Sequence, residues 1–180
     1  MNTLISLHDR AVAPIARADW LLPTLARLVF AGVLLMYFWA SGMTKLGSGI
    51  TGLFTPSLGA YAQIFPRAME AAGFDISQLG LWHRLVVVAG TWAEFILPLL
   101  ILLGLMTRLA ALGMIGFILV MTATDLIGHG AWAQPETLGA WFDRAPDSLI
   151  MDQRALWLLV LMVLVVKGAG PLSLDRLIRR

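Results

Sequence analysis

The chain contains no cysteine, which excludes disulfide bonds, thiol catalysis and thiolate metal ligands. A redox role would therefore need a bound ligand or a partner protein. Charge is also scarce, because Asp, Glu, Lys and Arg together make up 13% of the residues, about half of their share in soluble domains. Residues 1–20 lack a continuous apolar stretch, so no cleavable signal peptide is expected.

Hydrophobic residues are abundant, at 59% of the chain, and they gather in long stretches. A soluble fold could not bury so much apolar surface, whereas a membrane helix needs about 20 mostly apolar residues. Four stretches approach that length, at about 21–44, 85–103, 109–127 and 154–170. We therefore predict an all-α, polytopic membrane protein. One transmembrane domain, residues 1–180, should form an antiparallel four-helix bundle with short interfacial helices.

The connections between the predicted spans differ in length. Only residues 104–108 separate the second span from the third, so these two spans should form a hairpin. The outer loops, 45–84 and 128–153, are long and should lie on one side of the membrane, with both termini on the other. The fourth span is short, and we expect Arg154 and Lys167 to extend their side chains toward opposite interfaces.

Basic residues near the helix ends predict the orientation. Of the 13 Lys and Arg residues, eight lie on the side of the termini and five on the side of the much longer loops. The eight are Arg10, Arg17, Arg27, Arg108, Lys167, Arg176, Arg179 and Arg180. This bias predicts that both termini are cytoplasmic.

Glu94 lies in the middle of the second span. An ionised carboxylate at that depth costs about 2.5–3.5 kcal/mol on insertion scales, so it should face the bundle interior and have a polar partner. Pro98 cannot donate the backbone hydrogen bond that the carbonyl of Glu94 would normally accept. The position suits a site for a quinone headgroup, a proton or a cation. The alternative is a structural Glu that links helices through a basic partner.

Two cations of the first span are candidate partners for Glu94. Arg27 and Lys45 are 18 residues, or five helical turns, apart and so share one face. Arg27 either extends to the nearby interface or pairs with Glu94, and Lys45 either anchors at the outer interface or reaches inward. His83 falls within about 20° of Glu94 around the helix axis and marks the outer mouth of the same stripe. Trp92 is a candidate for stacking on a flat ligand.

Asp125 and His129 have the i, i+4 spacing that can place two metal ligands on one helix face. Gly128 and Gly130 flank His129, so the helix should end there, which favours a capping or loop hydrogen bond. We therefore assign no metal site. Whether these two residues converge with His83 depends on the fold.

Glycines within the spans are expected to let helices approach closely. They are Gly32, Gly42, Gly90, Gly113 and Gly116. The last two do not have the GxxxG spacing, so no dimer motif is predicted and the oligomeric state stays open.

Three ordered sequence features resemble the DoxX family of small four-helix membrane proteins. They are Arg27 with Gly32 and Gly42-Met-Thr-Lys45-Leu46, then Glu94 followed by Leu-Leu-Gly104-Leu-Met-Thr-Arg108, and finally Gly168-Ala-Gly170-Pro171-Leu-Ser173-Leu-Asp175. The resemblance covers most of the chain. It implies a bacterial or archaeal cytoplasmic membrane, a four-helix bundle and an association with oxidoreductase or sulfur metabolism. The family includes DoxX and DoxD-like subunits linked to thiosulfate:quinone oxidoreduction.

We therefore predict a DoxX-like membrane subunit of a bacterial inner membrane that binds a quinone among its helices. Glu94 would accept a proton or a hydrogen bond, and Arg27 or Lys45 would balance its charge. One alternative is a non-catalytic anchor or assembly partner of a soluble oxidoreductase, which would dock on the outer loops. Another is a transporter of a small solute or metal, which the single buried carboxylate and the lack of inverted repeats disfavour.

Whether the chain is itself an enzyme stays open at this point. No motif for a soluble cofactor is present in the sequence. The expected partners are the lipid bilayer and an oxidoreductase, not nucleic acid.

Overall fold

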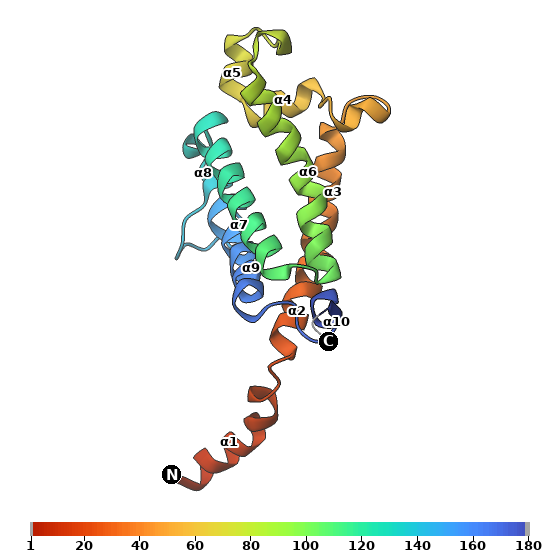
Figure 1. Ribbon diagram of the computed structural model, residues 1–180. Coiled ribbons are helices and arrows are strands. Elements are labelled where there is room, and N and C mark those ends of the chain that lie inside the picture. The colour runs from red at the N-terminus through yellow and green to blue at the C-terminus, as the bar shows by residue number, and fades with distance from the viewer. Residues whose placement is uncertain (1, 179–180) are drawn as a thin grey trace.

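A computed structural model describes residues 2–178, and in this range the chain forms helices and loops without a β-strand (Figure 1). Arg179 and Arg180, which belong to the predicted basic C-terminus, lie outside the described residues. Four helices are long and apolar enough to cross a membrane, and they are Leu21–Lys45, Leu81–Leu103, Thr107–Gly128 and Leu149–Lys167. The predicted all-α, four-span class is confirmed.

Three of the four spans contain a π-helical segment, in which each turn holds an extra residue. In chain order the elements of the spans are α2 (Leu21–Phe30), π-helical Ala31–Leu35, α3 (Met36–Lys45), α6 (Leu81–Leu103), α7 (Thr107–Ala123), π-helical Thr124–Gly128, π-helical Leu149–Arg154 and α9 (Ala155–Lys167). The second span begins four residues before the predicted 85, and the fourth begins five residues before the predicted 154.

The spans are packed as an antiparallel bundle. Helix α6 packs against α3 and α7, and α9 packs against α2 and α7. Both described ends of the chain lie at one end of the bundle, which we call the terminal end, and α4, α5 and α8 lie at the other, the loop end (Figure 1). The core between the helices consists mainly of large apolar side chains. It includes Phe30, Leu34, Phe38, Ile101, Met114, Ile118, Trp157, Leu161 and Leu164.

The loop end is built from short helices. They are 3₁₀-helical Ile50–Leu53, α4 (Leu58–Ile64), α5 (Pro66–Ala71), 3₁₀-helical Ile76–Gln78, 3₁₀-helical Ala131–Ala133 and α8 (Pro135–Leu138). Tyr61 of α4 and Met69 of α5 are buried in one cluster with Val87, which fixes both helices on the first turns of α6. Asp75 caps the segment Ile76–Gln78, and hydrogen bonds from the Ser77 side chain and backbone lower the pKa of Asp75.

The terminal end carries α1 (Asn2–Ala16), which extends away from the bundle, and α10 (Leu174–Ile178), which lies beside it (Figure 1). The predicted hairpin turn between α6 and α7 is also here. Gly104 ends α6 in the left-handed region, with φ 66°. A Cβ at this position would lie 2.6 Å from Cβ of Ser173 and 2.9 Å from Cζ of Arg27, so only glycine fits.

Candidate functional site

Lys45 and Glu94 form an ion pair inside the bundle. The residues are 4% and 2% exposed, and Nζ of Lys45 lies 2.9 Å from each carboxylate oxygen of Glu94. Ser41 completes the group, because its hydroxyl donates to Oε1 of Glu94 at 2.9 Å and accepts from Lys45 Nζ at 2.7 Å. The prediction of a polar partner for Glu94 is confirmed, and Lys45 is the cation that reaches inward.

Helix geometry brings these three side chains together. Ser41 and Lys45 are four residues apart on α3 and therefore lie on one face. Lys45 is the last residue of α3, and its side chain turns back so that Nζ lies 3.4 Å from the carbonyl oxygen of Ser41. Gly42 lies between them, and a Cβ there would be 2.7 Å from Cζ of Phe95. Glycine thus allows α6 to approach closely enough for Glu94 to meet both partners.

A cavity of about 370 Å³ lies beside the ion pair, between α6 and α7. Lys45, the last residue of the first span, lines this cavity, and Gln63 and Ile64 of α4 also form part of its wall. The other lining residues belong to the second and third spans, and they are Val86, Ala89, Gly90, Ala93, Glu94, Leu97, Gly113, Gly116, Phe117, Val120, Met121, Thr124 and Asp125. The walls are therefore mostly apolar, and the charged groups in them are Lys45, Glu94 and Asp125.

Missing side chains create part of this space. No heavy atom lies within 4 Å of a Cβ built on Gly116, and a Cβ on Gly90 would meet only Ile64, at 3.8 Å. Close helix approach is confirmed at Gly42 and also at Gly113, where a Cβ would lie 3.0 Å from Leu97. It is wrong at Gly32 and Gly116, where a Cβ would meet no heavy atom within 4 Å, and at Gly116 the open space is part of the cavity.

The rim of the cavity lies on the outer surface of the bundle. Val120 is 63% exposed, and Ala89, Gly113 and Gly116 are exposed as well. All four residues belong to helices that are long and apolar enough to cross a membrane. A lipid-soluble molecule would therefore reach the cavity sideways, from the acyl-chain region.

Asp125, in the cavity wall, belongs to a second ion pair. Its Oδ2 contacts Nη2 of Arg154, and Nη1 of Arg154 donates to Thr122 Oγ1 at 2.9 Å. The two side chains differ in burial, with 3% of Arg154 and 27% of Asp125 exposed. Asp125 is thus the more accessible of the two carboxylates in the cavity.

Two π-helical segments position this second pair. Asp125 lies in Thr124–Gly128, and Arg154 is the last residue of Leu149–Arg154. The expectation that Arg154 extends to an interface is wrong, because the fourth span begins five residues earlier, at Leu149. Arg154 therefore lies more than one turn inside the helix, where Asp125 neutralises it.

Arg27 lies at the terminal end and does not line the cavity. Its Nε donates to the carbonyl of Ile101 at 3.1 Å and its Nη2 to that of Leu102 at 2.5 Å, both near the end of α6. Its Nη1 donates to the carbonyls of Ala169 at 3.0 Å and Leu172 at 2.5 Å, in the loop after α9. Of the two predicted roles, the pairing with Glu94 is wrong, because Glu94 pairs with Lys45, whereas the predicted extension of Arg27 toward the nearby end of the bundle is found. Arg27 caps the C-terminal end of α6, where the helix dipole favours a cation.

His83 and Trp92 lie near the loop end and are not among the residues that line the cavity. The imidazole of His83 packs edge-on against Phe65, with 4.8 Å between ring centroids, and within the described residues its buried Nδ1 has no hydrogen-bond partner. The indole N–H of Trp92 donates to the carbonyl of Leu53 at 3.0 Å. Trp92 therefore fixes the short helix Ile50–Leu53 on α6.

His129 is used in a loop contact. Its Nε2 lies 2.9 Å from the carbonyl oxygen of Gln63, which connects the end of the third span to α4. Asp125 turns to Arg154, and His83 packs on Phe65. In the described part of the chain no three His, Cys, Asp or Glu side chains come close enough to hold a metal ion.

Sequence reasoning missed three parts of this site. Ser41 was visible as an i, i+4 partner of Lys45, which is the signal that would have found it. The pairing of Arg154 with Asp125 had no such signal, because the two residues are 29 positions apart in different spans. The open space at Gly116 likewise depends on how α6 and α7 diverge.

Comparison with known proteins identifies one family. The family model named DoxX matches residues 22–130, which is more than half of the chain and includes Lys45, Glu94 and Asp125. No curated protein and no solved structure matches the chain.

Proposed function

This chain belongs to the DoxX family of membrane proteins, and we propose that it is a subunit of a redox system that binds a quinone between α6 and α7. The observation that carries the proposal is the buried Lys45–Glu94 pair in the wall of a mostly apolar cavity within the spans. A quinone has an apolar ring and tail, and its oxygen atoms exchange protons and hydrogen bonds. The volume of about 370 Å³ is at the small end of ligand pockets, which suits a single headgroup.

The two carboxylates in the cavity wall keep hydrogen-bonding capacity as acceptors. Oε1 of Glu94 accepts from Lys45 and Ser41, whereas Oε2 accepts from Lys45 alone. Oδ2 of Asp125 is occupied by Arg154, and no donor within the described residues bonds its Oδ1. Each carboxylate oxygen can accept about two hydrogen bonds. The two carboxylates therefore suit the hydroxyl groups of the reduced form, a quinol.

Proton and electron transfer would then be divided between this chain and a partner. Oxidation of a quinol to a quinone releases two protons and two electrons. Glu94 and Asp125 are the groups placed to receive protons from the hydroxyls. The electrons pass to an oxidoreductase, and in the reverse direction that partner supplies them.

The loop end is the surface we assign to that partner. Trp132, Trp141 and Phe142, in the loop between the third and fourth spans, are 65%, 60% and 103% exposed, and exposed large apolar side chains mark candidate protein contacts. A non-catalytic anchor would use the same surface but would not need the cavity. We also place the chain in a bacterial inner membrane with both termini in the cytoplasm, as the distribution of basic residues favours.

A side chain that fills the cavity tests the proposal without touching the ion pairs. Gly116→Leu places a large side chain where a Cβ meets no neighbour, so the fold should persist. Gly32→Leu is the matched control, because Gly32 also has no neighbour within 4 Å but lies outside the cavity. Binding of a short-tailed quinol to each purified protein is measured by quenching of tryptophan fluorescence.

We expect Gly116→Leu to raise the Kd at least about tenfold, the equivalent of roughly 1.4 kcal/mol, and Gly32→Leu to leave it unchanged. Equal binding by both variants, or no binding by the wild type, would reject the cavity as a quinone site. In that case the anchor function becomes the better description.

A further inference from the structure

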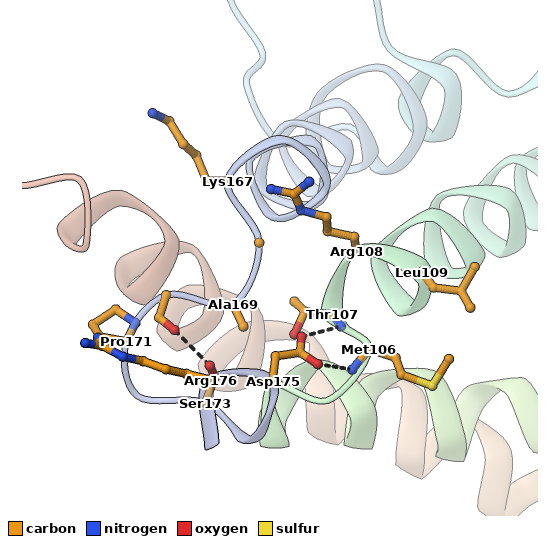
Figure 2. Close-up of a pocket in the computed structure, with 12 residues that line it drawn as sticks. Met106, Thr107, Arg108, Leu109, Lys167, Ala169, Pro171, Ser173, Asp175 and Arg176 are labelled. Carbon is orange, nitrogen blue, oxygen red and sulfur yellow. Dashed lines mark hydrogen bonds between the residues drawn. The ribbon is translucent and has the colours of Figure 1, made fainter. Parts of the chain in front are cut away.

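We propose that a second pocket, at the terminal end of the bundle, binds the phosphate group of an anionic phospholipid (Figure 2). This pocket has a volume of about 620 Å³. Its walls are the turn between α6 and α7, the first residues of α7, the end of α9 and the loop that leads to α10. It is separate from the quinone cavity, with which it shares no lining residue.

Three cations from three helices line the pocket. They are Arg108 of α7, Lys167 at the end of α9 and Arg176 of α10. Figure 2 shows that the Arg108 and Lys167 side chains extend from neighbouring helix ends, while Arg176 lies beside Pro171. In this view the three side chains extend in different directions from around the loop after α9, so their positive charges are spread along the wall of the pocket.

These cations keep hydrogen-bonding capacity for a ligand. Nη2 of Arg108 donates to the carbonyl of Val166 at 3.2 Å, which occupies one of its five N–H groups. Lys167 Nζ is 3.6 Å from Asp19, and both side chains are largely exposed, so this pair is weak. Within the described residues, Arg176 makes no ion pair.

The pocket is lined by one acidic residue, Asp175, which can offset at most one of the three positive charges. Asp175 accepts the backbone N–H of Met106 at 2.7 Å and of Thr107 at 3.0 Å, as the dashed lines in Figure 2 show. Its carboxylate thus holds the start of α7, and the pocket keeps a net positive charge. A phosphate oxygen is the kind of acceptor that Arg and Lys side chains bind best in such a place.

The position of the pocket selects a lipid over a soluble anion. The third span begins at Thr107 and the fourth ends at Lys167, so the pocket lies at the depth of the headgroups. Met106 and Leu109 are 55% and 60% exposed beside it and offer apolar contact for acyl chains. Basic pockets between transmembrane helices at this depth are typical sites for anionic headgroups.

The test compares two triple variants of the full chain. Arg108→Gln, Lys167→Gln and Arg176→Gln remove the three cations of the pocket. The control removes three exposed cations at the loop end instead, by Arg67→Gln, Arg84→Gln and Arg144→Gln. Binding of phosphatidylglycerol, phosphatidylcholine and inorganic phosphate to the purified proteins is measured by native mass spectrometry and by the shift in Tm.

We expect phosphatidylglycerol to bind the wild type and the control, and to bind the pocket variant at least about 100-fold more weakly, since each cation contributes roughly fivefold near a membrane surface. If the triple variant does not fold, the single substitutions test the same point, because each is expected to weaken phosphatidylglycerol binding about fivefold. Equal phosphatidylglycerol binding by pocket and control variants would overturn the proposal. The proposal would also be overturned if the wild type bound phosphatidylcholine, or inorganic phosphate at the same concentration, as tightly as phosphatidylglycerol.

Discussion

The two ends of the bundle are held together by different kinds of polar contact. At the terminal end, Arg27 donates to four backbone carbonyls, and Asp175 accepts two backbone N–H groups. Toward the loop end the buried charged side chains instead pair with one another, as Lys45–Glu94 and Arg154–Asp125. A backbone group cannot change its charge, whereas a carboxylate can take up a proton or a new donor.

This difference separates architecture from chemistry. The contacts of Arg27 fix where α6 ends and where the chain returns after α9, and they offer nothing to a ligand in the cavity. The two carboxylates hold helices together and also face a cavity. Buried ion pairs add little stability over apolar residues of the same shape, so their presence at a cavity favours a role beyond stability.

The largest effect on stability is expected from Arg27→Leu. Four backbone carbonyls would lose a charged donor, and at roughly 1 kcal/mol for each we expect a loss of about 4 kcal/mol in unfolding free energy. Arg27→Lys should recover only part, because an ammonium lacks the planar fork. Arg17→Leu, on the exposed surface, is the control and should change stability by less than about 0.5 kcal/mol. Denaturant titration in mild detergent measures all three.

Substitution of Glu94 is expected to cost less stability than Arg27→Leu but to weaken quinol binding more. Glu94→Leu leaves Lys45 buried without its partner and should cost about 3 kcal/mol. Adding Lys45→Met should restore much of that stability, because both charges are then gone. Glu94→Gln keeps the shape and should fold, but it should weaken quinol binding at least about tenfold, since a neutral amide is the poorer acceptor.

The Glu94 variants decide whether this residue has an architectural role, as Arg27 has, or a role in ligand binding. If Glu94→Gln binds quinol as the wild type does and only Glu94→Leu unfolds, Glu94 is an architectural residue like Arg27. If Glu94→Leu is stable and binds quinol normally, the site proposal fails altogether.

Single cysteines should leave stability almost unchanged and report which end faces outward. The chain has no native cysteine, so Thr55→Cys, Gln134→Cys and Leu172→Cys each introduce one labelling site at an exposed position. In intact cells an impermeant maleimide should label the first two, at the loop end, and not the third, at the terminal end. Labelling of Leu172→Cys alone would reverse the proposed orientation.

Local patterns along the chain were enough to predict the fold. Apolar length identified four spans, and the five residues 104–108 identified the hairpin, because both depend on neighbouring residues only. The inward position of Glu94 followed from the cost of exposing a carboxylate to lipid. These rules do not depend on how the helices pack.

The parts that could not be predicted depend on packing between distant elements. To choose Lys45 rather than Arg27 as the partner of Glu94, one must know the relative positions of the first and second spans along the bundle axis. The role of Arg27 could not be predicted because it depends on the loop after α9, which returns across the end of α6. The position of Arg154 was predicted wrongly because the fourth span begins with the π-helical segment Leu149–Arg154. The apolar and polar residues of that segment do not follow the periodicity of an α-helix.

The contacts of Arg27 also set an order of events during biosynthesis. Arg27 lies in the first of the four spans, but two of its four carbonyl partners belong to Ala169 and Leu172, which follow the fourth span. Lys45 can meet Glu94 as soon as the second span has been inserted. The Lys45–Glu94 pair can therefore form before the third and fourth spans are made, since chains fold from the N-terminus as they emerge. The contacts of Arg27 at the terminal end must wait until the fourth span and the loop after it have been made.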